Sequence, residues 1–257
     1  MQKIKILDVG CDRTVINKIA KKNKNYKIEC FMFEPDRSNI NQMKRDSKIH
    51  NNFKISLHNY CLSKYNKFLK FYKNFSSTTS SIYKSDIDEV KLVRNDNFFN
   101  FVSFSKIKSQ NLKFFFTKNK VKKIDFMSLY TQGSELDILK GAQSQIKNIS
   151  IIRCHAFWIH LYKNDTEKEK TPLIGDVISY LNKCGFKLFH LNPNNTFVDK
   201  QYNSEMFFIN NKYFYFSKRN KNNKDIVRCA YILAYLGKYT EVFYLLKKNK
   251  IEIEIFK

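Results

Sequence analysis

The chain has 257 residues, 43% of them hydrophobic and with 24 Phe and 15 Tyr among them, so it can build a bulky aromatic core and is not a disordered polypeptide. Its formal net charge is +24, and its length predicts one large domain or one domain with an addition, since a domain holds about 100–200 residues. The six Cys include no Cys-x-x-Cys pair and no apolar run approaches the ~18 residues of a membrane span, which argues against a zinc site and a transmembrane helix.

Apolar runs alternate with amphipathic stretches, which is the pattern of βαβ units that build a mainly parallel sheet. In chain order we expect strands at residues 4–9, 28–33 and 53–58, with helices at 15–24 and from the capping Asp36 to about residue 48. Between residues 60 and 120 the pattern weakens. There, 68–72 is a candidate strand, 76–81 is a polar Ser-rich loop, and 98–116 fits a strand, a helix or the apolar wall of a pocket.

The regular alternation returns with a predicted strand at 124–130, followed by a helix that Ser134 can cap. The next elements are a strand at 149–154 and a helix that starts at Thr171–Pro172 and ends at Gly185. Strands at 186–191 and 205–210 follow, with a short one at 213–216. Together these elements predict an α/β fold with a Rossmann-like, doubly wound, mostly parallel seven-stranded sheet.

From residue 225 the pattern changes to two helices, 226–236 and 239–248, which form a predicted hairpin broken at Gly237. One helix pair is not a repeat array, because about three repeats are needed for stability. We therefore expect a Rossmann-like domain over residues 1–218 and a C-terminal helical appendage over 219–257 that packs on the domain or on a partner.

Polar positions follow the first two predicted strands. Gly10 belongs to the motif Asp8-Val-Gly-Cys11, where a glycine lets the backbone approach a ligand with no Cβ in the way. Glu34 stands 24 residues later, where an acidic residue can bind ribose hydroxyls in a doubly wound sheet. An ordinary strand–turn–helix followed by an exposed Glu explains these residues equally well, so alone they do not decide between a nucleotide site and a plain turn.

Several motifs, in their order and spacing, resemble the FkbM family of methyltransferases over about residues 3–216. The opening motif is 6–10 (ILDVG), and the second is 33–36 (FEPD). The third is 59–63 (NYCLS), with the loop 76–81 after it, and the most specific stretch is 124–142 (IDFMSLYTQGSELDILKGA). Gly185–Phe186 and the strand at 205–209 also fall where the family places them.

The resemblance implies a Rossmann-like domain that uses S-adenosylmethionine, commonly for O-methylation in sugar, polyketide or other small-molecule pathways. We therefore expect S-adenosylmethionine as cofactor and a small hydroxylated acceptor, such as a sugar or glycan precursor, as substrate. The cofactor-binding positions that the resemblance implies are Asp8, Gly10 and Cys11 for the methionine side, Glu34 for the ribose hydroxyls, Pro35 and Asp36 for the adenosine flank, and Tyr60, Cys61 and Ser63 for the adenine end.

The chain departs from the family near the reacting centre. Thr14 stands where the family usually has a second glycine, Ser128 where it commonly has Lys, and Tyr130 where it commonly has Asp. Tyrosine cannot supply the carboxylate that an Asp would turn toward the methyl donor. The resemblance leaves Tyr130, the variant Gln132, the retained Glu135, and His155, at the end of the fifth strand, as candidate catalytic positions.

Three interpretations of these departures stay open. The site has moved, with His155 or His160 as general base, since an unperturbed histidine pKa of about 6.5 suits removal of a hydroxyl proton. The enzyme relies on positioning alone. The domain has kept its fold and lost activity, and serves as a binding or scaffold module. A core histidine is the simpler interpretation of His155, and the sequence requires no metal.

The net charge of +24 normally indicates nucleic acid or another anionic partner. Only 7 of the 47 basic residues are Arg, however, and the Lys are spread along the chain among Asn, whereas nucleic-acid readers rely on Arg. A general drift toward Lys and Asn explains the charge better, and RNA methylation is a weaker alternative that requires Lys to cluster on the face of the site. Because no signal peptide is recognised, we expect a cytoplasmic protein with free thiols; its oligomeric state is open.

Overall fold

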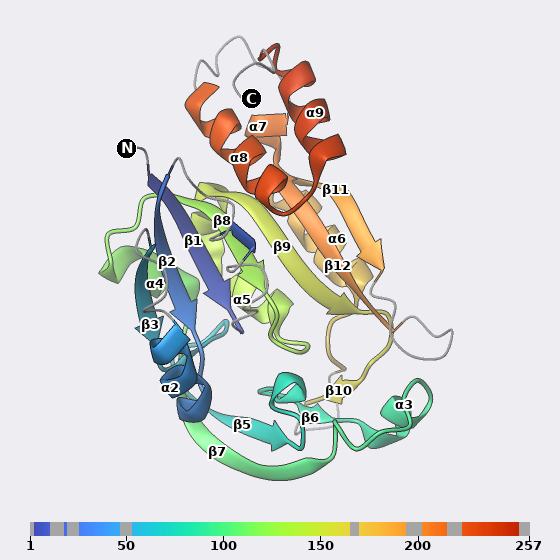
Figure 1. Cartoon of the computed structure of the whole chain (residues 1–257). Helices are drawn as coiled ribbons and strands as arrows, with labels where there is room; N and C mark the ends of the chain where they lie inside the picture. Colours follow the sequence, from blue (N-terminus) through green and yellow to red (C-terminus); the bar gives the residue numbers. More distant parts are fainter. Residues whose placement is uncertain are drawn as a thin grey trace.

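The computed structural model describes residues 3–10, 18–19, 26–46, 53–164, 170–193, 202–214 and 223–251, and its centre is a seven-stranded sheet (Figure 1). In spatial order the strands are β11 (Phe186–Pro193), β12 (Asn203–Asn210), β9 (Ile149–Phe157), β8 (Ile124–Leu129), β1 (Lys3–Val9), β2 (Lys27–Phe33) and β3 (Phe53–His58). The last five strands of this order run parallel to one another, and β12 runs antiparallel to both of its neighbours. The predicted mostly parallel α/β sheet is confirmed.

Helices pack on both faces of this sheet, as a doubly wound fold requires. Successive side chains of a strand point to opposite faces, so Leu7 joins the hydrophobic cluster of one face and Ile6 that of the other. Strands buried on both faces appear in the sequence as near-continuous apolar runs, which is why their positions were predictable. The first face is covered by α4 (Leu112–Lys118), α5 (Glu135–Ala142) and α6 (Ile174–Lys183), and the second by α2 (Arg37–Asp46), α8 (Asn223–Tyr235) and α9 (Tyr239–Lys248).

Figure 1 shows further strands lying beyond the ends of β1 and β8. The Phe-rich stretch 98–116 contains one of these further strands, β7 (Phe101–Gln110), and the start of helix α4. A strand and a helix are two of the three alternatives that the sequence left open. The elements outside the central sheet are a three-stranded sheet of β4 (Cys61–Leu62), β7 (Phe101–Gln110) and β5 (Phe68–Asn74), the pair of β6 (Lys84–Ser85) with β10 (Tyr162–Lys163), and the short helices η2 (Ser77–Thr79), α3 (Ile87–Lys91), η3 (Gln143–Asn148) and α7 (Asn211–Phe214).

The predicted start of the helix before Gly185 was wrong. Helix α6 begins at Ile174, not at Thr171–Pro172, because the Thr171 hydroxyl donates to the carbonyl oxygen of Tyr162 at 2.8 Å and is not a cap. The N-cap residue is Leu173, and its backbone N–H donates to the carboxylate of Asp176 in the first helical turn at 2.9 Å. The helix predicted at 15–24 lies outside the described residues, apart from 18–19, which are helical.

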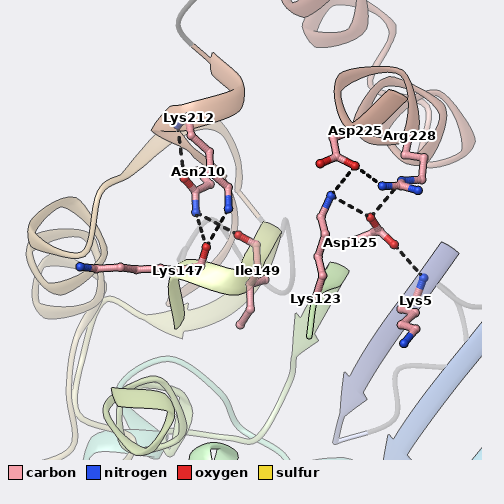
Figure 2. A network of polar contacts seen from close by, with 9 residues as sticks. All are labelled: Lys5, Lys123, Asp125, Lys147, Ile149, Asn210, Lys212, Asp225 and Arg228. Carbon is pink, nitrogen blue, oxygen red and sulfur yellow. Dashed lines mark hydrogen bonds and ion pairs between the residues drawn. The ribbon is translucent and has the colours of Figure 1, made fainter. Parts of the chain in front are cut away.

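The short strand predicted at 213–216 is also wrong for its described part, which belongs to helix α7. The chain turns because Asn210, the last residue of β12, bonds across the sheet end. Its amide donates to the carbonyl oxygens of Ile149 at 3.1 Å and Lys147 at 3.3 Å (Figure 2). Its side-chain oxygen accepts from the backbone N–H of Lys212, which starts the helical turn.

The C-terminal helices form the predicted hairpin, with Gly237 between them at a φ of +76°. Apolar residues of both helices, such as Ile226 and Leu245, share a cluster with Ile6 and Phe126 of the central sheet. The hairpin therefore packs on the sheet, and the domain boundary at residue 218 stays a prediction. No helix within the described ranges combines the length and apolarity that a bilayer span requires.

An ion-pair network fastens α8 to the first residues of β8 and β1 (Figure 2). Lys123 Nζ lies 2.7 Å from Asp225 and 3.4 Å from Asp125, and Arg228 pairs with both carboxylates. The backbone N–H of Lys5 donates to Asp125 at 2.9 Å. Burial alone would raise the pKa of Asp225, but Lys123 and Arg228 lower it below 3.8. Burial would lower the pKa of Lys123, but Asp225 and Asp125 raise it above 10.5.

These shifts predict a pH dependence of the hairpin's stability. The ionised Asp225 stabilises the fold above its unfolded pKa of 3.8, and this contribution is lost as the pH falls through the lower folded-state pKa. That of Lys123 is present below pH 10.5 and is lost as the pH rises through the higher folded-state pKa. We expect Asp225→Asn to lower the free energy of unfolding at neutral pH by about 2 kcal/mol.

Urea unfolding measured across this pH range tests the prediction. The difference between wild type and Asp225→Asn should shrink at both extremes, whereas Asp88→Asn, at an exposed position of α3, should match wild type throughout. An Asp225→Asn variant as stable as wild type at neutral pH would show that apolar packing alone holds the hairpin.

Candidate active site

Three of the predicted positions become neighbours because the central strands end in register. The backbone N–H of Gly10 donates to the carbonyl oxygen of Phe33 at 3.2 Å, directly before Glu34. On the other side of β1, the N–H of Tyr130 donates to the carbonyl oxygen of Val9 at 2.9 Å. The residues that follow β1, β2 and β8 therefore lie side by side at the carboxyl edge of the sheet, where doubly wound folds bind ligands.

Gly10 has a structural reason to be glycine. Its φ is +82°, in the left-handed region, and a Cβ added there would lie 1.9 Å from the carbonyl oxygen of Tyr130. The neighbouring strand end therefore requires glycine at this position by itself, whether or not a ligand also approaches it. Asp8 is fully buried on β1 beside this turn, and Cys11 and Thr14 lie outside the described residues.

Glu34 is held in place by its own turn. Only 7% of the residue is exposed, and its carboxylate accepts from the backbone N–H of Asp36 at 2.8 Å. The Asn59 amide donates to the carbonyl oxygens of Glu34 and Pro35 at 3.1 and 3.0 Å. This oriented carboxylate can accept hydrogen bonds from a diol.

Asp36 caps helix α2 as the sequence predicted. Its carboxylate accepts from the backbone N–H of Ser38 at 2.9 Å and pairs with Lys73 of β5 at 2.8 Å. Burial would raise the pKa of Asp36, but the bonds to Lys73 and Ser38 lower it below its usual value. The ion pair joins the turn after β2 to the strands beyond the sheet.

The positions after β3 lie in packed surroundings. Tyr60 contacts the ring of Phe33, with 5.4 Å between ring centroids, and burial raises the pKa of its hydroxyl to about 12. Burial likewise raises the pKa of the Cys61 thiol to about 12. Ser63 is 1% exposed and bonds to the carbonyl oxygen of Tyr65 at 3.1 Å and to the Ser109 hydroxyl. Cys61 and Ser63 thus join β4 to β7.

The loop after β8 is shaped by Glu135. Its buried carboxylate accepts from the backbone N–H groups of Thr131 at 2.7 Å and Gly133 at 2.9 Å. Burial raises the pKa of Glu135, and these N–H groups oppose the rise. Ser134 stands at the N-cap position but forms no capping bond with its side chain, which donates to Thr131 instead. Glu135 therefore orders the loop, and the cap that the sequence predicted for the Ser134 side chain does not form.

Gln132, at the tip of that loop, connects it to the Ser-rich loop 76–81. Its φ is +58°, its carbonyl oxygen accepts from the Ser81 hydroxyl at 2.7 Å, and its side chain accepts from the Tyr162 hydroxyl at 3.2 Å. Tyr162 also donates to the carbonyl oxygen of Thr79 at 2.9 Å. The Ser-rich loop thus lies against the loop after β8.

His155 lies within strand β9, which continues to Phe157 and is longer than predicted. The residue is 1% exposed. Its ring lies 4.2 Å from that of Tyr130 and 4.9 Å from that of Phe157, measured between centroids. The structure therefore joins two of the predicted catalytic positions, Tyr130 and His155, across the ends of β8 and β9. His160 bonds instead to the carbonyl oxygen of Thr171.

Sequence reasoning missed a charged pair next to these residues. Arg153 donates to the Ser128 hydroxyl at 3.0 Å and, through Nε, to Glu205 of β12 at 2.7 Å. Ser128 is the register partner of both Asp8 and Arg153, so the guanidinium lies in the row that contains Asp8. The signal was an arginine inside an apolar strand, where a charge needs a partner. Within the described ranges, no group of three or more His, Cys, Asp or Glu is placed to hold a metal.

The mostly parallel α/β fold is the one that the resemblance to methyltransferases implied, and the comparison with protein families agrees. The model of the methyltransferase FkbM domain matches residues 8–188. Because this match covers well over half of the chain, the chain belongs to the FkbM methyltransferase family, whose members use S-adenosylmethionine. The predicted family, enzyme class and cofactor are thereby confirmed.

Solved structures show only distant likeness. LepI in complex with SAM is 12% identical with a TM-score of 0.38, over 81% of this chain and 43% of LepI, so the chain spans less than half of that protein. A SAM-dependent methyltransferase from Methanosarcina mazei is 8% identical with a TM-score of 0.39, over 82% of this chain and 93% of that one. An rRNA methylase from Streptococcus thermophilus is 10% identical with a TM-score of 0.35, over 81% and 87%. No curated protein matches the sequence.

Proposed function

We propose that the protein methylates a hydroxyl oxygen of a small acceptor, such as a sugar or glycan precursor, with S-adenosylmethionine as methyl donor. The observation that carries this proposal is the adjacency of the Gly10 turn, the oriented Glu34 carboxylate and the Tyr130–His155 pair at one edge of the sheet. Family membership supports the donor, and the acceptor rests on the chemistry of a nearby histidine. The predicted cytoplasmic location stays a prediction.

The residues present fit the cofactor. A carboxylate held by a backbone N–H, as in Glu34, is suited to two neighbouring ribose hydroxyls, and its position after β2 is where doubly wound folds place it. When bound, S-adenosylmethionine supplies an electrophilic methyl group. We propose Asp8, Gly10 and Cys11 for its methionine side and Pro35 and Asp36 for the adenosine flank. Tyr60, Cys61 and Ser63 would shape the adenine end, the last two through packing.

Glu34→Gln is expected to weaken the binding of S-adenosylmethionine and S-adenosylhomocysteine by about tenfold or more, because it removes a charge-assisted hydrogen-bond acceptor. Calorimetry on the purified protein measures this directly. Glu29→Gln is the matched control, since Glu29 lies on β2, the strand that directly precedes Glu34, and its carboxylate pairs with Lys5 and Lys54. Unchanged affinity in a folded Glu34→Gln variant would refute the assignment of Glu34.

We propose that an imidazole nitrogen of His155 takes the proton that the acceptor hydroxyl loses. His155→Gln should lower kcat by roughly 10²–10⁴-fold and remove the limb of the pH–rate profile due to histidine. His160→Gln, which replaces a histidine bonded to the carbonyl oxygen of Thr171, should leave kcat and the pH–rate profile unchanged. An unchanged profile in His155→Gln would favour catalysis by positioning alone. A folded wild-type protein that binds no cofactor would instead favour the binding or scaffold role that Ser128 and Tyr130 suggested.

A further inference from the structure

Strands β5 and β7 pair antiparallel as a ribbon beyond the ends of the central strands (Figure 1). One side of the ribbon packs inward through the buried Phe71. Side chains opposite one another in the register share a face. The other side is here named the outer face. By this register it carries Phe68, Lys70, Tyr72, Asn74, Phe101, Phe104, Lys106 and Lys108, of which Tyr72 and Asn74 are buried.

A β-bulge brings the aromatic residues of the outer face together. The register shifts between Lys73 and Asn74, which leaves Val102 as an extra residue in β7. Phe101 and Phe104, three residues apart, therefore both contact the ring of Tyr72, with centroids 6.1 and 6.4 Å away. Phe101 and Phe104 are nevertheless 47% and 59% exposed.

More large apolar side chains are exposed at the two ends of the ribbon and at the bulge. The backbone N–H of Phe75 donates to the carbonyl oxygen of Asn100, so Phe75 extends the same ladder. Phe75 is 70% exposed and Val102 is 62% exposed. Phe68 is 62% exposed at the other end of the outer face. Large apolar side chains that gather in this way, and do not occur singly, mark an interaction surface.

Strands β5 and β7 contain several lysines and no acidic residue. No Asp or Glu occurs between Asp46 and Asp86 or between Asp96 and Asp125, two stretches that contain both strands. Lys106 and Lys108 lie on the outer face and are exposed. Lys70 is the register partner of Lys106, and like charges in that relation destabilise a ribbon. The charge pattern of the outer face is complementary to an anionic partner.

We propose that the outer face of the β5–β7 ribbon binds an anionic phospholipid surface. Exposed Phe and Val side chains would enter the boundary between headgroups and acyl chains, and the lysines would contact the headgroups. The two strands contain Lys and no Arg, and the aliphatic Val102 is as exposed as Phe68. Both features favour a lipid surface over single-stranded RNA, whose binding relies on flat stacking platforms and Arg. This surface is independent of the proposed methyl transfer.

Vesicle sedimentation of the full chain tests the proposal, with phosphatidylcholine vesicles that contain or lack phosphatidylserine. Wild type should bind only the anionic vesicles, and less at high salt. The double variants Lys106→Glu/Lys108→Glu and Phe68→Ser/Phe104→Ser should each lose about tenfold or more of this binding. All four positions are solvent-facing, and unfolding curves like that of wild type would show that the fold is kept.

The matched control is Phe243→Ser/Lys247→Glu on α9. Phe243 is 50% exposed and Lys247 Nζ lies 5.8 Å above its ring, so this pair has the same chemistry on another element. It should bind vesicles like wild type. Wild type that ignores anionic vesicles, or an equal loss in the α9 control, would overturn the proposal. So would binding of a single-stranded RNA oligonucleotide that depends on the outer face while vesicle binding is absent.

Discussion

Gly10→Ala is expected to lower the free energy of unfolding by about 3 kcal/mol or more, because the substitution combines backbone strain with a collision. The φ of +82° is unfavourable for any residue with a Cβ. The added Cβ would lie 1.9 Å from the carbonyl oxygen of Tyr130, a backbone atom that cannot rotate away. Strands β1 and β8 would have to separate at their carboxyl ends, where the candidate site lies.

Urea unfolding measures this effect, and Gly175→Ala is the control. Gly175 lies in helix α6, and a Cβ added there meets nothing within 4 Å. That variant should equal wild type or gain up to about 1 kcal/mol from helix propensity. A Gly10→Ala protein as stable as wild type would contradict the prediction and show that the two strand ends accommodate a Cβ at this position. Gly10 variants also cannot serve as probes of cofactor contact alone, since they disturb the sheet first.

Arg153→Met is expected to destabilise the protein by about 3 kcal/mol, because it leaves the Glu205 carboxylate without its main cation in a largely buried place. The side chains of Arg153 and Glu205 are only 6% and 15% exposed. Removing both charges, in Arg153→Met/Glu205→Gln, should restore most of the loss. Methionine keeps most of the apolar stem of arginine, so the comparison isolates the charge.

A double-mutant cycle from urea unfolding gives the coupling energy between the two residues. Lys212→Met is a suitable control, since the Lys212 ammonium donates to the carbonyl oxygen of Lys147 at an exposed position and should contribute little to stability. Additive losses in the cycle would show that Arg153 acts through Ser128 and not through Glu205. Because Ser128 is the register partner of Asp8, calorimetry on Arg153→Met would also show whether this row of side chains supports cofactor binding.

Local features of this protein could be predicted from the sequence where the interacting residues lie close together in the chain. Asp36 was predicted as a cap because its carboxylate reaches Ser38, two residues away. The break at Gly237 was readable because the left-handed turn needs glycine, whatever packs around it. Thr171 and Ser134 were predicted as caps and are not. The Thr171 hydroxyl bonds to the carbonyl oxygen of Tyr162, which lies on another element, and the Glu135 carboxylate holds the loop beside Ser134.

The residues of the candidate site were likewise predictable only where the signal in the sequence is local. Gly10 and Glu34 were found from the sequence because each directly follows an apolar strand, and the hydrophobic pattern alone locates strand ends. Ser63 was assigned to the cofactor on its position, yet its hydroxyl bonds within the β4–β7 layer. Arg153 and Glu205 lie on strands that meet only in the sheet, so no local pattern could pair them.

The sequence by itself thus determined the order of the strands along the chain, the family and the edge of the sheet at which the candidate site lies, because apolar periodicity and short motifs act over neighbouring residues. Only the tertiary structure decided which side chains meet at that edge. The register of β1, β8 and β9 sets Tyr130 against His155 and Arg153 against Ser128, and a one-residue slip would turn each of them to the opposite face. It likewise decided that lysines from two distant segments would face one another on the β5–β7 ribbon, since strand pairing is a long-range choice.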